Sequence, residues 1–146
     1  MTVVNDEQYM KQALSEAQKA FDKGEVPVGA IIVCNNRIIA RAFNLTETLN
    51  DVTAHAEMQA ITAAASALGG KYLIDCTLYV TVEPCPMCAG ALAWSQISRV
   101  VYGASDEKRG YHLFLPDLLH PKTTVVSGIL AEEAAALMQQ FFKEKR

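Results

Sequence analysis

The residues with the clearest chemistry in this sequence are a histidine, a glutamate and two cysteines in two short motifs. His55 and Glu57 lie two positions apart in TAHAEM, and Cys85 and Cys88 lie three apart in EPCPMCA. A helix places residues i and i+3 on one side, so both thiolates of the C-x-x-C pair would face the same way. Zinc binds thiolate sulfur and imidazole nitrogen readily, which makes His55 the obvious third ligand. The pattern therefore predicts a Zn²⁺ site formed by His55, Cys85 and Cys88.

The number of protein ligands decides what such a site does. A structural zinc site is closed by four ligands, whereas a catalytic site keeps one position for water. The other candidates, Cys34, Cys76, His112 and His120, have no motif partner. We expect the two cysteines to be small buried side chains at strand ends and the two histidines to be surface or packing residues. The site is therefore predicted to be open.

Glu57 is the predicted catalytic residue. On a regular helix, residues i and i+2 point to different sides, so His55 and Glu57 can share a site only if His55 lies at the helix start. Placed there, Glu57 can take a proton from the activated water and later hand protons to the substrate. The alternative interpretation is a solvent-facing acid in the first helical turn, where the helix dipole favours negative charge.

Together the two motifs form the pattern H-x-E…P-C-x-x-C, which is typical of zinc deaminases. In that chemistry the activated water attacks the ring carbon that bears the amine, and the glutamate protonates first the ring nitrogen and then the departing amine. The patterns H-E-x-x-H, G-x-S-x-G and G-x-x-x-x-G-K-[ST] of other enzyme classes are absent from the sequence. A rival hypothesis from another class is a zinc-stapled binding module without catalysis.

Hydrophobic spacing indicates the elements that must position these residues. Strands alternate with helices along the chain, which predicts an α/β domain with one central sheet and helices packed over it. Helices are expected over 5–22, 55–68 and 86–94, strands over 28–33, 37–43, 77–82, 99–103 and 123–127, and a long functional loop over 103–122. A last helix is expected to bury its apolar residues in the core or against a second subunit: Leu130, Ala134, Leu137, Met138, Phe141 and Phe142.

Composition narrows the class of protein. With 146 residues, of which 51% are hydrophobic and 20% charged, the chain is expected to form a single zinc-dependent deaminase domain over 1–146. No apolar run is long enough to span a bilayer, so no membrane partner is expected. The start MTVVNDEQ lacks the features of a secretory signal, and four cysteines do not suggest a disulfide scaffold. These features predict a cytoplasmic protein, and the net charge of −3 makes no demand for a nucleic-acid partner.

Over nearly its whole length the chain resembles the bacterial tRNA-specific adenosine deaminases of the cytidine deaminase-like superfamily. The resemblance is carried by EVPVGAIIV, NDVTAHAEMQAI, YLIDCTLYVTVEPCPMCAGAL and SRVVYGA, and by the ending GILAEEAAALMQQFFKEKR. It implies a three-layer α/β fold with a central mixed sheet of about five strands, Zn²⁺ as cofactor and a homodimer. It also implies conversion of the wobble adenosine in a tRNA anticodon loop to inosine.

The resemblance also implies roles for residues around the zinc site. Asn44 matches an asparagine that contacts the nucleoside, although a residue of its type is also common in the turn at a strand end. Ala56 would offer its backbone N–H to the base, and Val28 and Pro84 would form walls of the pocket. Asp51 would orient the metal ligands without binding the metal itself, or would cap the start of the following helix instead. Glu83 is expected to form structural hydrogen bonds.

Two features depart from the family pattern and keep a second substrate class open. The segment SDEKRGYHLFLPDLLHPKTTVV, residues 105–126, lacks the Gly/Ala-rich stretch usual there and some polar residues that help the family hold RNA, and position 52 is Val instead of Pro. The alternative function is deamination of guanine or another free purine or nucleoside by the same zinc chemistry. The C-terminal ending favours tRNA over these small molecules.

Overall fold

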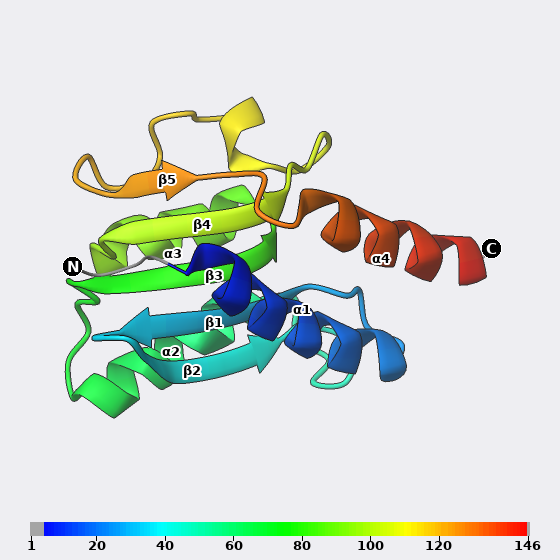
Figure 1. The fold of residues 1–146 in the computed structure, drawn as a ribbon, viewed down its shortest axis with the longest axis horizontal. Helices are drawn as coiled ribbons and strands as arrows, with labels where there is room; N and C mark the ends of the chain where they lie inside the picture. Colours follow the sequence, from blue (N-terminus) through cyan, green and yellow to red (C-terminus); the bar gives the residue numbers. More distant parts are fainter. Residues whose placement is uncertain (1–4, 146) are drawn as a thin grey trace.

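In a computed structural model, residues 5–145 form a five-stranded sheet with two helices on each face (Figure 1). The strands lie in the order β2-β1-β3-β4-β5; β1 is antiparallel to both β2 and β3, whereas β3, β4 and β5 run parallel. None of the helices in this part of the chain is long and apolar enough to cross a membrane. The elements are α1 (Asp6–Asp22), β1 (Gly29–Cys34), β2 (Arg37–Phe43), α2 (Ala56–Leu68), β3 (Cys76–Val82), α3 (Pro86–Ser95), β4 (Arg99–Ala104), the 3-10 helix η1 (Tyr111–Leu113), β5 (Thr124–Val126) and α4 (Ala131–Glu144).

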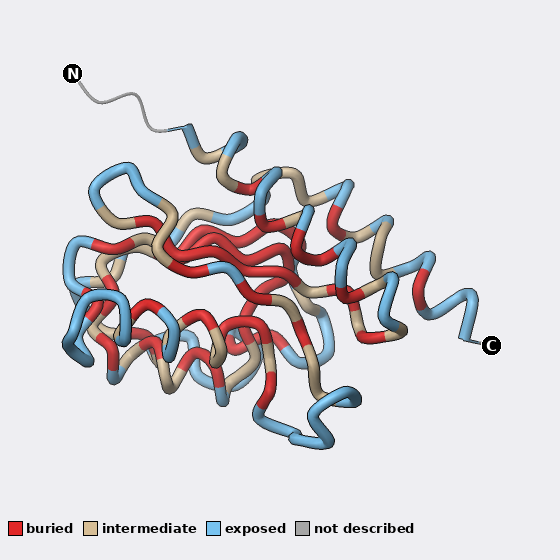
Figure 2. Tube along the Cα trace, turned by 90° about the horizontal axis from the view of Figure 1, so that it is seen from below, coloured by how far each residue is buried: buried red, intermediate tan, exposed pale blue. Residues whose placement is uncertain are grey.

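The sheet is buried between two helical layers, and the helices turn their exposed faces to solvent (Figure 2). On one face, Met10 and Ala13 of α1 pack against Ile31, Tyr79 and Val101 of three adjacent strands. Helix α4 lies on the same face, against β3, β4 and α1. The three-layer arrangement expected from the sequence is therefore confirmed.

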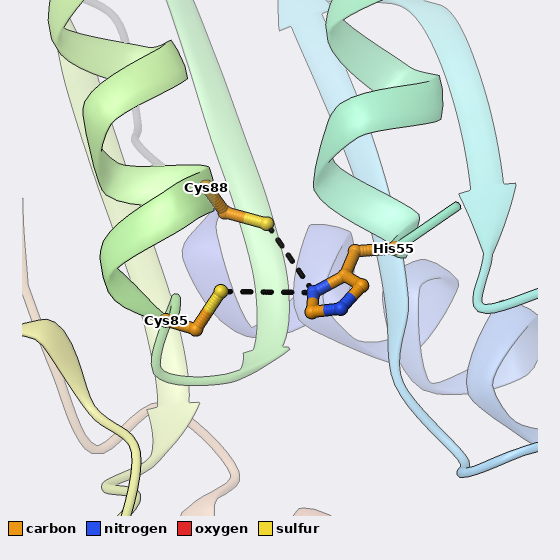
Figure 3. Close-up of side chains that lie close together, drawn as sticks. All are labelled: His55, Cys85 and Cys88. Carbon is orange, nitrogen blue, oxygen red and sulfur yellow. Dashed lines mark hydrogen bonds between the residues drawn. The ribbon is translucent and has the colours of Figure 1, made fainter. Parts of the chain in front are cut away.

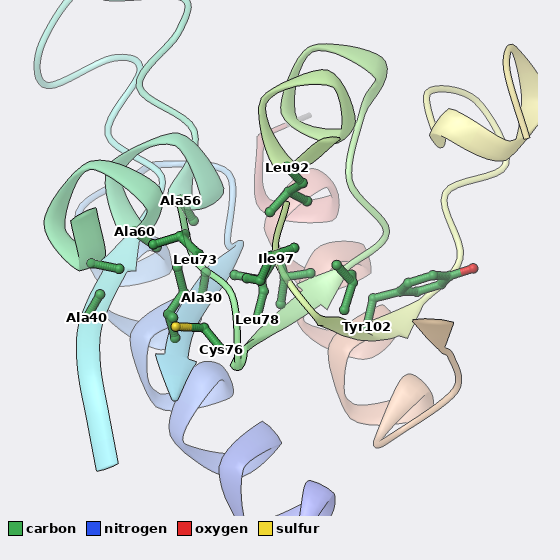
Figure 4. Packing of buried hydrophobic residues seen from close by; sticks show 14 of the residues in the cluster. Ala30, Ala40, Ala56, Ala60, Leu73, Cys76, Leu78, Leu92, Ile97 and Tyr102 are labelled. Atoms are coloured by element: carbon green, nitrogen blue, oxygen red, sulfur yellow. The ribbon is translucent and has the colours of Figure 1, made fainter. Parts of the chain in front are cut away.

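Helices α2 and α3 cover the other face and enclose the larger core cluster (Figure 4). Ala56, Ala60 and Ala64 of α2 are fully buried there, next to the apolar side chains of the sheet. These small side chains fall on one helical stripe, so the helix can lie close to the strands. Leu92 of α3 fills the same core from the neighbouring helix. This packing places the two helices side by side.

Local sequence signals account for several boundaries. The Asn5 side chain caps α1 by accepting a hydrogen bond from the Gln8 N–H at 3.4 Å. Asn35 and Asn36 have φ angles of 52° and 60°, as a two-residue type I′ hairpin turn between β1 and β2 requires. Gly29 lies directly under α1, where an added Cβ would come within 2.1 Å of the Ala13 carbonyl oxygen.

The predicted helices and strands are all present, and two expectations need correction. The segment 103–122 is not wholly loop, because β4 extends to Ala104 and η1 forms within it. In the last helix only Ala134 and Phe141 are buried, whereas Phe142 is 46% exposed. Phe141 packs edge-on against Phe21 of α1, with ring centroids 6.0 Å apart, and this leaves the next side chain on the outer face. The single domain expected over 1–146 includes residues 1–4 and 146, which lie outside the described residues.

Candidate active site

His55, Cys85 and Cys88, the metal-ligand group, come together between the starts of α2 and α3 (Figure 3). The Nδ1 atom of His55 lies 3.7 Å from Sγ of Cys85 and 3.5 Å from Sγ of Cys88. Sulfur and nitrogen ligands around a tetrahedral ion lie roughly 3.4–3.8 Å apart, given metal–ligand bonds of 2.0–2.3 Å. The three side chains therefore fit a metal ion. Within residues 5–145 no fourth His, Cys, Asp or Glu joins them.

Two helix starts converge on this group. His55 is the N-cap of α2 and Cys85 is the N-cap of α3, and neither side chain caps its own helix. Both residues have extended backbone angles, so their side chains point away from the helix axis toward each other. The partial positive charge at each helix start favours thiolates and other negative charge between them. The expected position of His55 ahead of the regular helix is confirmed.

The two thiols differ in how readily they ionise. A hydrogen bond from Cys88 lowers the pKa of Cys85 to about 4, against the effect of burial. The same contact, together with burial, raises the pKa of Cys88. His55 has a raised pKa because it is hydrogen-bonded to Cys85. A bound cation would favour ionisation of both thiols, because metal ligands must be deprotonated.

Glu57 lies in the first turn of α2, with only 3% of its surface exposed. Burial raises the pKa of its carboxyl group to about 7. The carboxyl adjoins Cys88, so the acid and the metal-ligand group occupy one site. A carboxyl group with a pKa near neutrality can both accept and donate a proton. The alternative of a solvent-facing glutamate in this turn is wrong.

A cavity of about 510 Å³ opens over these residues, which is large enough for a nucleobase. Its lining includes the predicted substrate contacts Asn44, Ala56 and Val28. Asn44 is held in place by its own side chain, since its Nδ2 donates to the Val26 carbonyl and its Oδ1 accepts from the Thr46 N–H. The remaining lining residues come from segments next to the strand ends, from the starts of α2 and α3, from the segment after β4 and from α4: Val26, Thr46, His55, Glu57, Val82, Glu83, Cys85, Pro86, Met87, Asp106, Arg109, Phe114 and Met138.

Comparison with known proteins places this site in a family. A model of the MafB19-like deaminases matches residues 4–146. The tRNA-specific adenosine deaminase of Bacillus subtilis is 50% identical over 149 residues, which cover 99% of this chain and 92% of that protein. The chain belongs to the tRNA-specific adenosine deaminase family. This confirms the resemblance read from the motifs and identifies the chain as a deaminase-type enzyme, not a zinc-stapled binding module.

Solved structures of related deaminases match most of the fold. A structure described as a tRNA:A34 deaminase that edits A to I at the wobble position has a TM-score of 0.83 and 43% identity, and covers 89% of this chain and 98% of that one. The guanine deaminase of Bacillus subtilis also has 43% identity, but its TM-score is 0.67 and the match covers 70% of this chain and 66% of that one. The likeness to the tRNA:A34 deaminase is therefore the more extensive of the two.

Two residues expected at the site of this deaminase do not line the cavity. The Asp51 carboxylate is exposed and accepts hydrogen bonds at 2.8 and 2.7 Å from the N–H and hydroxyl of Thr53, outside the cavity lining. It holds the turn before α2 without capping that helix, whose N-cap is His55. Pro84 is buried between the lining residues Glu83 and Cys85, and its carbonyl accepts a hydrogen bond from the Tyr111 N–H, while Pro86 lines the cavity itself.

The remaining cysteines and histidines have structural contacts. Cys76 is buried in the core beneath α2, and Cys34, directly opposite it in the sheet, packs against the same cluster. Nδ1 of His112 lies 2.5 Å from the Glu83 carboxylate, and Nδ1 of His120 accepts a hydrogen bond from the Lys122 N–H. The packing and surface roles expected for these four residues are confirmed, as is the structural hydrogen bonding expected of Glu83.

One residue that supports the cavity of this deaminase was missed by sequence reasoning. Glu25 is fully buried between α1 and β1, and its two carboxylate oxygens accept hydrogen bonds from the N–H groups of Glu47 and Thr48 at 3.0 and 2.6 Å. Burial opposes its ionisation, yet these hydrogen bonds lower the pKa of Glu25 below its ordinary value. They tie down the turn after Asn44. In the sequence, Glu25 is only a charged residue beside an apolar stretch. That pattern does not indicate a hydrogen-bond partner 22 positions away.

Proposed function

We propose that this protein converts the wobble adenosine of a tRNA anticodon loop to inosine, with release of ammonia. The observation that carries the proposal is that His55, Cys85, Cys88 and the buried Glu57 share one cavity large enough for a nucleobase. Relatives named as tRNA-specific adenosine deaminases, at 50% identity in Bacillus subtilis and 47% in Aquifex aeolicus, support this substrate.

We propose Zn²⁺ as the metal held by His55, Cys85 and Cys88. Two thiolates and one imidazole suit zinc, and three protein ligands are typical of its catalytic sites. When bound, zinc supplies Lewis-acid activation of the attacking water. The two helix starts that meet at the group favour the negative charge that develops there during the reaction.

Glu57 moves the protons. Its carboxylate accepts a proton from the attacking water and delivers it to N1 of the adenine ring, which makes C6 more susceptible to attack. The second proton from that water passes through the same carboxyl group to the amine at C6, which leaves as ammonia and leaves a carbonyl oxygen in its place. A pKa of about 7 suits both directions of transfer at neutral pH.

Three further residues position the nucleoside. Asn44 has one amide hydrogen left after its contact with Val26 and can donate it to the ribose or base. The Ala56 N–H lies in the first turn of α2, where backbone donors have no partner within the helix. Val28 supplies an apolar wall of the cavity. Asp51 and Pro84 would act only through the backbone that they hold, because neither lines the cavity.

A homodimer in the cytoplasm is the assembly and location that we propose. Helix α3 carries two exposed apolar side chains about two helical turns apart. Trp94 is 85% exposed and Met87 is 37% exposed. A large exposed aromatic side chain is common at protein interfaces and costly in water. Sedimentation equilibrium should show a dimer for the wild-type chain and monomers for Trp94→Glu. A monomeric wild-type protein would refute the dimer.

The rival substrate class is guanine or another free purine or nucleoside, which the likeness to a guanine deaminase favours. Both classes can be offered to the zinc-loaded protein in parallel: an anticodon stem-loop with a wobble adenosine, the same stem-loop with guanosine there, and a panel of free bases and nucleosides. Ammonia release and nucleoside chromatography report the products. We expect inosine only in the adenosine stem-loop. Turnover of a free purine with an unchanged stem-loop would refute the proposal.

A further inference from the structure

The segment that follows β4 is fixed to Glu83, the residue two positions before Cys85. The Glu83 side chain is fully buried, and its oxygens accept hydrogen bonds at 3.1 Å from the N–H groups of Asp106 and His112. Nδ1 of His112 lies 2.5 Å from the same carboxylate. This contact therefore sets the position of residues 105–113 relative to the metal-ligand group. The segment leaves the sheet beyond the end of β4 (Figure 1).

Gly110 and Tyr111 complete this attachment. A Cβ added to Gly110 would lie 2.4 Å from the carboxyl carbon of Glu83, so only glycine allows the chain to pass this close. The next residue, Tyr111, is buried, and its N–H donates to the Pro84 carbonyl at 3.0 Å. The backbone that leads into η1 is thus held against the connection between β3 and α3, which leads directly into the cysteine motif.

Beyond the attachment, this segment presents an apolar side chain at the cavity. Phe114 lines the cavity that contains Glu57, yet 57% of its surface is exposed. Its backbone is held by a hydrogen bond from its N–H to the Tyr111 carbonyl at 3.0 Å. An exposed aromatic ring on a fixed backbone at the rim of a cavity is suited to stacking against a flat ligand.

The same segment also contributes a cation to the cavity lining. Arg109 is exposed and also lines the cavity, and its backbone N–H donates to the Asp106 carboxylate at 2.9 Å. Among the described residues its guanidinium takes part in no ion pair. A guanidinium without an ion pair and an exposed aromatic ring at one cavity match the combination of phosphate and base that a single-stranded nucleic acid presents.

We propose that Phe114 and Arg109 form a subsite for the nucleotide adjacent to the target adenosine. The neighbouring base stacks on the Phe114 ring, and the phosphate between the two nucleotides contacts the Arg109 guanidinium. This inference rests on the proposed function and deepens it, because a free purine has neither a neighbouring base nor a phosphate. The subsite would thus favour polynucleotide over free-base substrates.

Steady-state deamination of the anticodon stem-loop tests the subsite. We expect Phe114→Ala to raise KM by roughly 5- to 100-fold, the range for loss of one base–aromatic stack, with kcat and zinc content unchanged. Phe114→Trp should restore the wild-type KM because it restores the stacking surface. Leu115→Ala removes an adjacent side chain that is 59% exposed but does not line the cavity, so its KM should stay at the wild-type value.

A salt titration tests Arg109 separately. Arg109→Ala should weaken stem-loop binding and reduce the slope of log affinity against log salt concentration by about 1, as expected for loss of one phosphate contact. Lys108→Ala is the matched control, since Lys108 is exposed in the same segment but does not line the cavity. An equal loss of slope in both variants would mean a diffuse charge effect and would overturn the Arg109 contact.

The outcomes separate failure of the subsite from failure of the proposed function. If the wild-type protein edits the stem-loop and Phe114→Ala has the same KM, the subsite is wrong and the proposed function stands. If the wild-type protein does not edit the stem-loop, both are wrong. If Phe114→Ala instead changes the sedimentation of the protein, the ring is covered by a second copy of the chain, which also overturns the subsite.

Discussion

His55 and Cys85 occupy equivalent positions on two neighbouring helices: each is the N-cap residue, and their Nδ1 and Sγ atoms lie 3.7 Å apart. At most helix starts the N-cap side chain accepts a hydrogen bond from its own helix. Here both side chains are turned to the metal-ligand group instead. Neither helix therefore has a side-chain cap at its first turn. The N–H groups at these helix starts, which have no partner within the helix, favour the negative charge of the metal-ligand group.

Removal of one ligand should abolish metal binding. We expect the wild-type protein to contain about one zinc ion per chain and Cys85→Ser to contain almost none, because a serine hydroxyl is a poor substitute for a thiolate. Metal analysis of dialysed protein measures this directly. Cys34→Ser is the matched control, since Cys34 packs against the core away from the site. Full zinc content in Cys85→Ser would contradict the assignment of this ligand.

The buried acid should be needed for turnover but not for the metal. We expect Glu57→Gln to lower kcat by roughly 10²- to 10⁴-fold, since the amide cannot transfer protons, while zinc content stays at the wild-type level. Ammonia release from the wobble-adenosine stem-loop and metal analysis on the same sample measure both quantities. Glu133→Gln, an equivalent change on the exposed side of α4, should leave both unchanged. Activity near the wild-type level in Glu57→Gln would rule out its proton-transfer role.

Short-range patterns predicted the parts of the site that adjacent residues determine. The strands expected over 28–33 and 37–43 leave only a short connection, and Asn35-Asn36 forms the hairpin turn there because both residues tolerate positive φ. The two-residue spacing of His55 and Glu57 required His55 to lie ahead of the regular helix, and it does. In each case the constraint acts within one turn of chain, where side-chain geometry and backbone conformation are directly linked.

Contacts between distant segments could not be predicted in the same way. The Glu25 carboxylate binds N–H groups 22 and 23 positions away, and nothing in its neighbours shows that partner. Pro86 lines the cavity, whereas Pro84 is buried with its carbonyl bonded to the Tyr111 N–H. Asp51 accepts hydrogen bonds from Thr53 in the turn before α2. The contacts of each of these residues depend on how loops from distant parts of the sequence pack against the sheet.

Glu25 should therefore matter for stability and for the shape of the cavity. We expect Glu25→Gln to lower the free energy of unfolding by roughly 1.5–3 kcal/mol, because an amide nitrogen would face one of the two buried N–H donors. Urea unfolding measures this change, and a raised KM for the stem-loop would report the loosened turn after Asn44. Glu47→Gln is the control, since only the backbone of Glu47 contacts Glu25. Equal stability of both variants would contradict this account.

The ion pair between Asp6 and Arg99 should make stability depend on pH. Arg99 donates two hydrogen bonds to the Asp6 carboxylate, at 2.7 and 2.5 Å, and the Tyr79 hydroxyl donates a third at 2.7 Å. The bond from Arg99 is the main cause of the lowered pKa of Asp6. A carboxylate with a lowered pKa stabilises the fold above its unfolded pKa of about 3.9, and this contribution is lost as the pH falls through the lower folded value.

Asp6→Asn should thus be less stable than the wild-type protein by roughly 1–2 kcal/mol at pH 7, with a smaller difference at pH 3, because below about pH 3.9 the unfolded wild-type chain binds a proton at this carboxylate more readily than the folded chain does. Urea unfolding at both pH values measures the two differences. Asp22→Asn at the other end of α1, where the carboxylate is exposed and contacts only Gln18, should show little change at either pH. A penalty for Asp6→Asn that is the same at pH 3 and pH 7 would mean that Asp6 acts through packing and not through its charge.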